Sequence, residues 1–239
     1  MLAALWWGGL AAASLLLGYA VSLRGLSNRA LGDLMGIGGG ALIGAIAYEL
    51  VPESAFGGLD IALAFGLGAI AFFVGDWLVD RRGGAERKDI AGGQQGGSGA
   101  AIFVGTLLDN VPESIVLGTS MALGGAVNVA FLVAVFISNL PEGVAGSVNL
   151  FAAGYERRRV LRMWTVLVFV SALSAALGYG VAHLLPTADG LYVQAFTAGA
   201  MLTMLADAMM PEAFEHGGPG VGLLTVLGFL AAAMLSTES

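Results

Sequence analysis

The chain contains no cysteine, which excludes disulfides, thiolate metal ligands and cysteine nucleophiles. Charge is also scarce: Asp, Glu, Lys and Arg make up 11% of the 239 residues, whereas soluble domains carry about 25%. Hydrophobic residues account for 57% of the chain, and the mean hydropathy is +0.85. This composition excludes an ordinary soluble enzyme, a disordered chain and a nucleic-acid-binding protein, and it indicates a polytopic membrane protein.

Eight apolar segments have about the length that crosses the hydrocarbon core of a bilayer. They are residues 2–23, 32–51, 59–79, 99–121, 127–150, 163–184, 190–211 and 220–236. We expect helices, because backbone polar groups in lipid need partners within their own segment. A closed barrel would need alternating strands, which these continuous apolar runs do not offer. The sequence therefore predicts an all-α membrane protein with eight transmembrane helices in a single domain, residues 1–239.

The ten Lys and Arg residues are confined to three connections, within residues 24–29, 81–88 and 157–162. Basic connections stay in the cytoplasm, so we expect both termini outside the plasma (inner) membrane. No basic residue precedes the first apolar segment, which predicts a retained span rather than a cleavable signal peptide. The glycine-rich stretch 82–99 is expected to be a flexible cytoplasmic loop.

A Pro-Glu pair recurs in four of the apolar segments, as Pro52-Glu53, Pro112-Glu113, Pro141-Glu142 and Pro211-Glu212. Proline removes a backbone donor and frees the carbonyl four residues earlier, so each pair predicts a kink beside a carboxylate. Asp109 and Glu113 are four residues apart, as are Ser138 and Glu142. Each of these two sets therefore shares one helix face.

Three of the acids, Asp109, Glu113 and Glu142, lie near the middle of their spans. An acid at the bilayer centre costs at least about 2.5 kcal/mol, and such residues mark functional sites by default. Neighbouring carboxylates also require a cation or a proton between them. We expect a metal site with the ligands Asp109, Asn110, Glu113, Ser138, Asn139 and Glu142. Protonated carboxylates that join helices remain the alternative.

The outer copies of the Pro-Glu pair predict a direction of passage. Segments 1–3 are expected to match segments 6–8 as an inverted repeat around the central pair 4 and 5, with a binding site at the midplane. Glu49 and Glu53 would then form an entrance. The connection between the seventh and eighth segments carries acids and no Lys or Arg, and with the end of the seventh segment it provides the predicted exit residues Asp207, Glu212, Glu215 and His216.

The two central motifs resemble those of the ZIP family (Zrt- and Irt-like proteins) of divalent metal transporters. That family carries His-Asn-x-Pro-Glu-Gly in span 4 and a related motif in span 5; here the residues are 109–114, DNVPES, and 138–143, SNLPEG. The resemblance implies eight spans, both termini outside, and metal ligands at the matching positions. Asp109 replaces the family histidine, and residues 171–175 hold no counterpart of a family glutamate in span 6. These departures imply one metal site rather than two.

The resemblance and the residues together predict transport of a divalent cation as substrate, of the zinc, iron or manganese class. Oxygen ligands favour harder ions than imidazole does. We expect no enzymatic activity and no nucleic-acid partner; the partners are the lipid bilayer and divalent cations, and a homodimer stays open. A metal-binding membrane sensor or a non-transporting relative is the alternative. An intramembrane hydrolase is disfavoured, because the chain lacks HExxH, GxSxG and a cysteine nucleophile.

Overall fold

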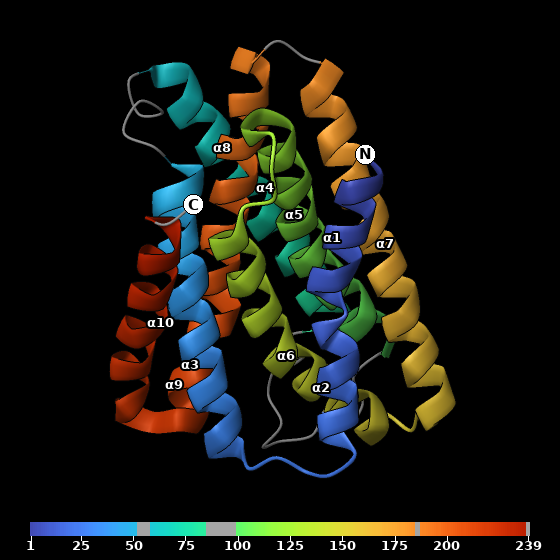
Figure 1. Ribbon diagram of the computed structural model, residues 1–239. Coiled ribbons are helices and arrows are strands. Elements are labelled where there is room, and N and C mark those ends of the chain that lie inside the picture. The colour runs from blue at the N-terminus through green and yellow to red at the C-terminus, as the bar shows by residue number, and fades with distance from the viewer. Residues whose placement is uncertain (52–57, 85–98, 185–186, 238–239) are drawn as a thin grey trace.

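The computed structural model describes residues 1–51, 58–84, 99–184 and 187–237, and every regular element in these ranges is helical (Figure 1). The elements are α1 (Leu2–Ala12), α2 (Ser14–Ser22), α3 (Asn28–Ala45), the π-helical turn η1 (Ile46–Leu50), α4 (Leu59–Val79), the π-helical turn η3 (Asp80–Gly84), α5 (Gly99–Gly124), α6 (Val129–Ala152), α7 (Arg157–Leu184), α8 (Thr187–Met204), the π-helical turn η4 (Leu205–Met209), α9 (Met210–Gly217), the 3₁₀ turn η5 (Gly218–Gly220) and α10 (Val221–Ser236).

Seven helical stretches of the described chain are long and apolar enough to cross a membrane. The last of them, residues 190–236, combines most of α8 with η4, α9, η5 and α10. Figure 1 shows α8 descending through the bundle and α10 rising beside α3, so the chain reverses near η5. The protein is therefore an all-α protein whose apolar helices are compatible with a multi-pass integral membrane protein.

The central helices α5 and α6 are enclosed by two similar sets of neighbours. Helix α3 packs on α10 and on α6, while α8 packs on α4 and on α5. Helix α2 packs on α6, α5 packs on α7, and α1 packs on α7. The polar groups of α5 and α6 consequently lie inside the bundle and away from its surface.

Glycine allows the closest of these helix contacts. A Cβ atom on Gly40 of α3 would overlap the carbonyl oxygen of Thr225 on α10, and one on Gly199 of α8 would overlap the carbonyl oxygen of Phe65 on α4. Small residues that let backbones approach are typical of helix packing in membranes. The glycine content of 38 residues is therefore partly explained by close contacts between helices.

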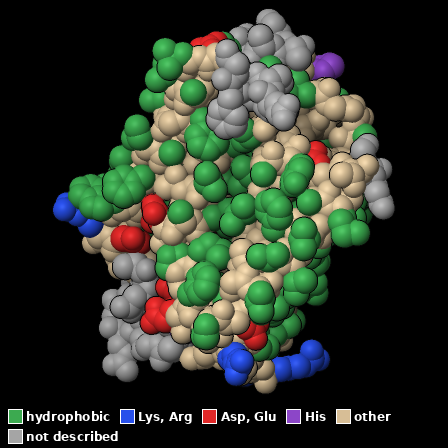
Figure 2. Space-filling model, turned by 90° about the vertical axis from the view of Figure 1, so that its left-hand side faces the viewer, with side chains coloured by type: hydrophobic (Ala, Val, Ile, Leu, Met, Phe, Trp, Pro, Cys, Tyr) green, Lys and Arg blue, Asp and Glu red, His purple; other side chains and the backbone are tan. Residues whose placement is uncertain are grey.

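The outer surface is rich in large apolar side chains. Leu63, Phe169, Leu223 and Met234 are each more than half exposed. Figure 2 shows hydrophobic side chains over much of one face, with Lys and Arg at its lower end and one margin. Such a continuous apolar surface is unusual for a soluble monomer, and it agrees with helices that face lipid.

The predicted segments correspond to helices, with differences at the ends. Helix α7 begins at Arg157, six residues before the predicted start, and α3 begins at Asn28. The expected connection after the seventh segment is wrong in one respect: Glu212, Glu215 and His216 lie on helix α9, because Pro211 in its first turn favours helix initiation. Glu53 and most of the loop 82–99 lie outside the described residues.

Candidate metal centre

All six predicted ligands lie on the two central helices and are buried. Their exposed fractions are 3% or less. Asp109, Asn110 and Glu113 are on α5, and Ser138, Asn139 and Glu142 are on α6. Both helices continue through Pro112 and Pro141. The prolines therefore remove backbone donors next to the carboxylates without ending the helices.

Asn139 connects the carboxylates of the two helices. With its amide nitrogen turned toward them, it donates to Oε2 of Glu113 and to Oε2 of Glu142, each at 3.2 Å. The Glu113 contact spans from α6 to α5, whereas the Glu142 contact stays within α6. One amide group thus holds two buried acids at equal distance.

Asn110 lies next to this amide on the side of α5. Its own nitrogen donates to the carbonyl oxygen of Thr106 at 3.0 Å. Its Oδ1 lies 3.1 Å from the amide oxygen of Asn139 in this orientation, so the two oxygens are in contact without a hydrogen bond, and the opposite orientation of Asn139 would let its nitrogen donate to Asn110. Because the nitrogen of Asn110 is held by its own helix, its oxygen faces α6. Asn110, Asn139, Glu113 and Glu142 therefore form one connected buried group, which we call the central cluster.

Ser138 and Asp109 are positioned differently from the central cluster. The Ser138 hydroxyl donates to the carbonyl of Val135 at 3.0 Å. On the backbone side, a Cβ on Gly38 of α3 would lie 2.8 Å from Cα of Ser138, so Ser138 lies at the α3–α6 contact. Asp109 is fully buried one helical turn before Glu113.

The donor set of the centre is small. Within the described part of the chain, no group of three or more His, Cys, Asp or Glu side chains lies close enough together to hold a metal ion. The structure brings together two carboxylates and two amides. An ion there would be bound by oxygen atoms of Glu113, Glu142 and the asparagines.

The predicted entrance and exit residues lie on the outer Pro-Glu copies. Glu49 is in η1 and Asp207, which is exposed, is in η4. On α9, Nε2 of His216 lies 3.1 Å from Oε2 of Glu212, and Glu215 is exposed. The described residues of this set are thus spread over η1, η4 and α9.

Four polar residues that the sequence did not single out line a cavity of about 440 Å³ beside Glu49. They are Ser120, Asn128 at the N-cap of α6, Gln194 of α8, and Ser236. Asparagine before a long apolar run is an N-cap signal, so the position of Asn128 at the start of a helix could have been predicted from the sequence. Gln194 interrupts an otherwise apolar stretch, which was the available signal for that residue.

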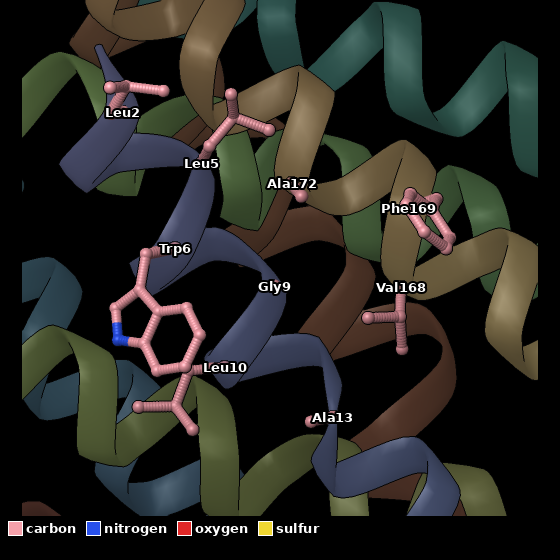
Figure 3. Close-up of a pocket in the computed structure, with 9 residues that line it drawn as sticks. All are labelled: Leu2, Leu5, Trp6, Gly9, Leu10, Ala13, Val168, Phe169 and Ala172. Atoms are coloured by element: carbon pink, nitrogen blue, oxygen red, sulfur yellow. The ribbon is translucent and has the colours of Figure 1, made fainter.

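A second cavity, of about 500 Å³, opens between α1 and α7 and has an almost entirely apolar lining (Figure 3). Its lining residues are Leu2, Leu5, Trp6, Gly9, Leu10, Ala13, Val168, Phe169 and Ala172. The side chains drawn in Figure 3 consist of carbon apart from the indole nitrogen of Trp6. This cavity offers no ligands for a cation.

The sequence was compared with protein-family models and with curated proteins. No protein-family model matches the sequence, and no curated protein matches it.

Proposed function

We propose that the protein transports a divalent metal cation of the zinc, iron or manganese class across the membrane through the central cluster. The observation that carries this proposal is the approach of Glu113 and Glu142, from two helices, to the single amide of Asn139 at 3.2 Å each. The three groups are almost completely buried.

The spacing of these atoms suits an ion. Oxygen ligands of zinc lie about 2.0–2.2 Å from the metal. Neighbouring ligands in tetrahedral or octahedral geometry are then roughly 3.0–3.5 Å apart. A half-turn of the Asn139 amide places its oxygen where the nitrogen donates now. The amide oxygen would then lie 3.2 Å from one oxygen of each carboxylate, which is a separation expected of neighbouring ligands in a coordination shell.

The charge of the two carboxylates allows a metal cation to exchange with a proton at this site. Two carboxylates that share one buried amide repel each other unless a cation or a proton compensates them. Metal binding and protonation compete for the same carboxylate oxygens. In the absence of metal, the amide nitrogen of Asn139 and a proton stabilise the two carboxylates. An incoming cation displaces the proton, and the Asn139 amide turns its oxygen toward the ion.

Two structural features support eight spans arranged as an inverted repeat. First, the residue before each outer proline bonds to the carbonyl five residues back: Val51 to Ile46 at 3.1 Å, and Met210 to Leu205. Second, α3 contacts α10 and α6 in the way that α8 contacts α4 and α5. Spans 2 and 7 run in opposite directions and carry these matching turns and contacts at equivalent places. Such a match is expected of two repeats that are related by an axis in the membrane plane.

The resemblance of residues 109–114 and 138–143 to the ZIP motifs agrees with this function. We place Glu49 at the external entrance, and Asp207, Glu212, Glu215 and His216 at the cytoplasmic exit, with both termini outside. Relative movement of helix groups around α5 and α6 would connect the central cluster to one side at a time. The chain has no nucleotide-binding motif, so the driving force is an ion gradient or the membrane potential.

The test is uptake of Mn²⁺, Zn²⁺ and Fe²⁺ into proteoliposomes that contain the full chain. Wild-type protein should take up at least one of these ions, and Glu113→Gln should reduce that uptake about 100-fold, because it removes a ligand charge. Binding of the same ions to detergent-solubilised protein is measured in parallel.

Glu156→Gln is the matched control, because it makes the same chemical change at an exposed residue in the connection between α6 and α7. It should leave uptake unchanged. Full uptake by Glu113→Gln would overturn the proposal. Metal binding without any flux in wild-type liposomes would instead identify a metal-binding sensor.

A further inference from the structure

The cavity beside Glu49 differs in chemistry from the apolar cavity between α1 and α7. It is bounded by five elements: η1, the end of α5, the start of α6, α8 and the end of α10. Its lining is largely polar and includes Glu49, Ser120, Asn128, Gln194 and Ser236. We call this cavity the vestibule. Its only acidic lining residue among those described is Glu49.

Asn128 holds one side of the Glu49 carboxylate. Its Oδ1 accepts from the backbone nitrogen of Phe131 at 2.8 Å, which caps α6. Its amide nitrogen is therefore directed outward, and it donates to Oε2 of Glu49. The other carboxylate oxygen, Oε1, is buried and has no hydrogen-bond partner within the described part of the chain. A buried carboxylate oxygen is costly unless a cation or water satisfies it.

The vestibule is large enough for a cation with its water. A water molecule takes about 30 Å³ in the liquid, so a cavity of about 440 Å³ holds roughly 15 waters. An ion with six bound waters would fill roughly half of it. One carboxylate and two amides are too few ligands for a dehydrated ion, whereas Mg²⁺-like ions retain several waters and bind through one or two carboxylates.

The vestibule is separate from the central cluster. Ser120 follows Glu113 by seven residues on α5, which corresponds to about 10 Å along the helix axis. Val116 and Leu117, both fully buried, lie between them in sequence. An ion in the vestibule is therefore not in contact with Glu113 or Glu142.

We infer that the vestibule binds a hydrated divalent cation, with Glu49 providing the charge and Asn128 and Gln194 contacting the ion's water. This inference rests on the proposed function, because it describes the first binding step of the same transport route. The ion reaches the central cluster only after it loses its water.

The experiment uses Mn²⁺ uptake into proteoliposomes and an inert competitor, hexaamminecobalt(III), which resembles a hydrated cation but cannot lose its ligands. The complex should inhibit wild-type uptake competitively. Glu49→Gln should raise the KM for Mn²⁺ about tenfold, with a much smaller change in maximal rate, and should weaken inhibition by the complex. Gln194→Leu should change both in the same direction by less.

Asp60→Asn is the matched control, because Asp60 is an exposed acid on α4, bonded to Tyr192 of α8, and does not line the vestibule. It should leave the KM and the inhibition unchanged. An unchanged KM in both Glu49→Gln and Gln194→Leu, or no competition by the complex, would overturn the vestibule site. The proposed transport would still be tested independently by the effect of Glu113→Gln on uptake.

The two proposals can fail separately. If wild-type protein shows no uptake, transport fails, and the vestibule is judged by Mn²⁺ bound to the solubilised chain, followed by electron paramagnetic resonance. Displacement of that Mn²⁺ by the cobalt complex in wild type but not in Glu49→Gln supports the site. Mn²⁺ binding that is insensitive to the complex refutes it.

Discussion

The described segments that lead into the inner and the outer Pro-Glu copies adopt two different structures. In the inner pair, on α5 and α6, the helix continues through the proline and the acid is buried. In the outer pair, the residues before the proline form the π-helical turns η1 and η4, and Asp207 is exposed. The same local sequence element therefore leads to a buried site in one place and to an opened turn in the other.

Packing accounts for this difference. The inner copies lie between helices, where neighbouring amides satisfy the acids: Asn139 bonds to Glu113 and Glu142. The outer copies lie near helix ends, where a wider turn moves the backbone bond from the fourth to the fifth preceding carbonyl and avoids the proline ring. π-Helical turns frequently occur at functional sites. The proline thus disturbs the regular helix, and the surroundings decide whether the neighbouring acid is buried between helices or follows a π-helical turn.

The largest expected effect separates the inner acids from the outer ones. Glu142→Gln should reduce metal uptake about 100-fold, since it removes charge from the central cluster. Glu212→Gln makes the same chemical change on α9, beside His216, and should reduce uptake less than about tenfold. Initial rates of uptake into proteoliposomes measure both. Equal losses in the two variants would show that the inner and outer copies do not differ in function.

A second prediction concerns the contact that holds α3 against α6. Gly38→Val should destabilise the protein by about 1–3 kcal/mol, because its side chain would press on the backbone at Ser138. Metal binding should weaken with it, since Asn139 follows Ser138 directly. Thermal unfolding, followed by tryptophan fluorescence with and without metal, measures both quantities.

Gly66→Val is the control for this prediction, because a Cβ on Gly66 of α4 meets nothing within 4 Å among the described residues. It should unfold at the wild-type temperature. If Gly38→Val also unfolds like wild type and binds metal normally, the tight α3–α6 contact does not support the central cluster.

The sequence predicted the helical class and the approximate helix positions, because long apolar runs have few other solutions in lipid. It also placed Asp109, Glu113 and Glu142 deep in their helices by simple counting. The partners of these residues were not predictable in this way. Which face of α6 meets α3, and hence that Ser138 lies against Gly38, depends on the rotation of one helix against another.

The two outer turns illustrate a further limit. Proline at 211 predicts a local distortion, but the choice of a π-helical turn depends on whether the surrounding helices leave room for it. The vestibule is a similar case, since its lining comes from four separate stretches of the chain, around residues 49, 120–128, 194 and 236. Asn128 and Gln194 are polar residues at unremarkable spacing, and only the folded arrangement brings them to Glu49.

The third prediction removes the cause of one outer turn. In Pro211→Ala, the new backbone N–H can bond to the carbonyl of Asp207, which allows η4 to tighten into an α-helix. Transport should slow by less than about tenfold, equivalent to less than about 1.4 kcal/mol, while binding to the central cluster stays unchanged. Uptake rates and equilibrium binding of Mn²⁺ separate the two effects. A loss of binding that matches the loss of rate would contradict the division between inner site and outer access turn.

The smallest effect is expected for the pair formed by His216 and Glu212. These side chains are 3.1 Å apart and one turn apart on α9, and only 3% of the His216 side chain and 17% of the Glu212 side chain are exposed. A single hydrogen bond of this kind contributes about 1 kcal/mol net. His216→Ala should therefore lower the unfolding temperature by less than about 4 °C, and it should leave metal binding at the central cluster unchanged. Differential scanning fluorimetry and Mn²⁺ titration measure these quantities. A larger fall in the unfolding temperature would mean that the outer copy on α9 is as firmly integrated in the bundle as the inner ones, because removing one member of a connected polar network costs more than a single bond.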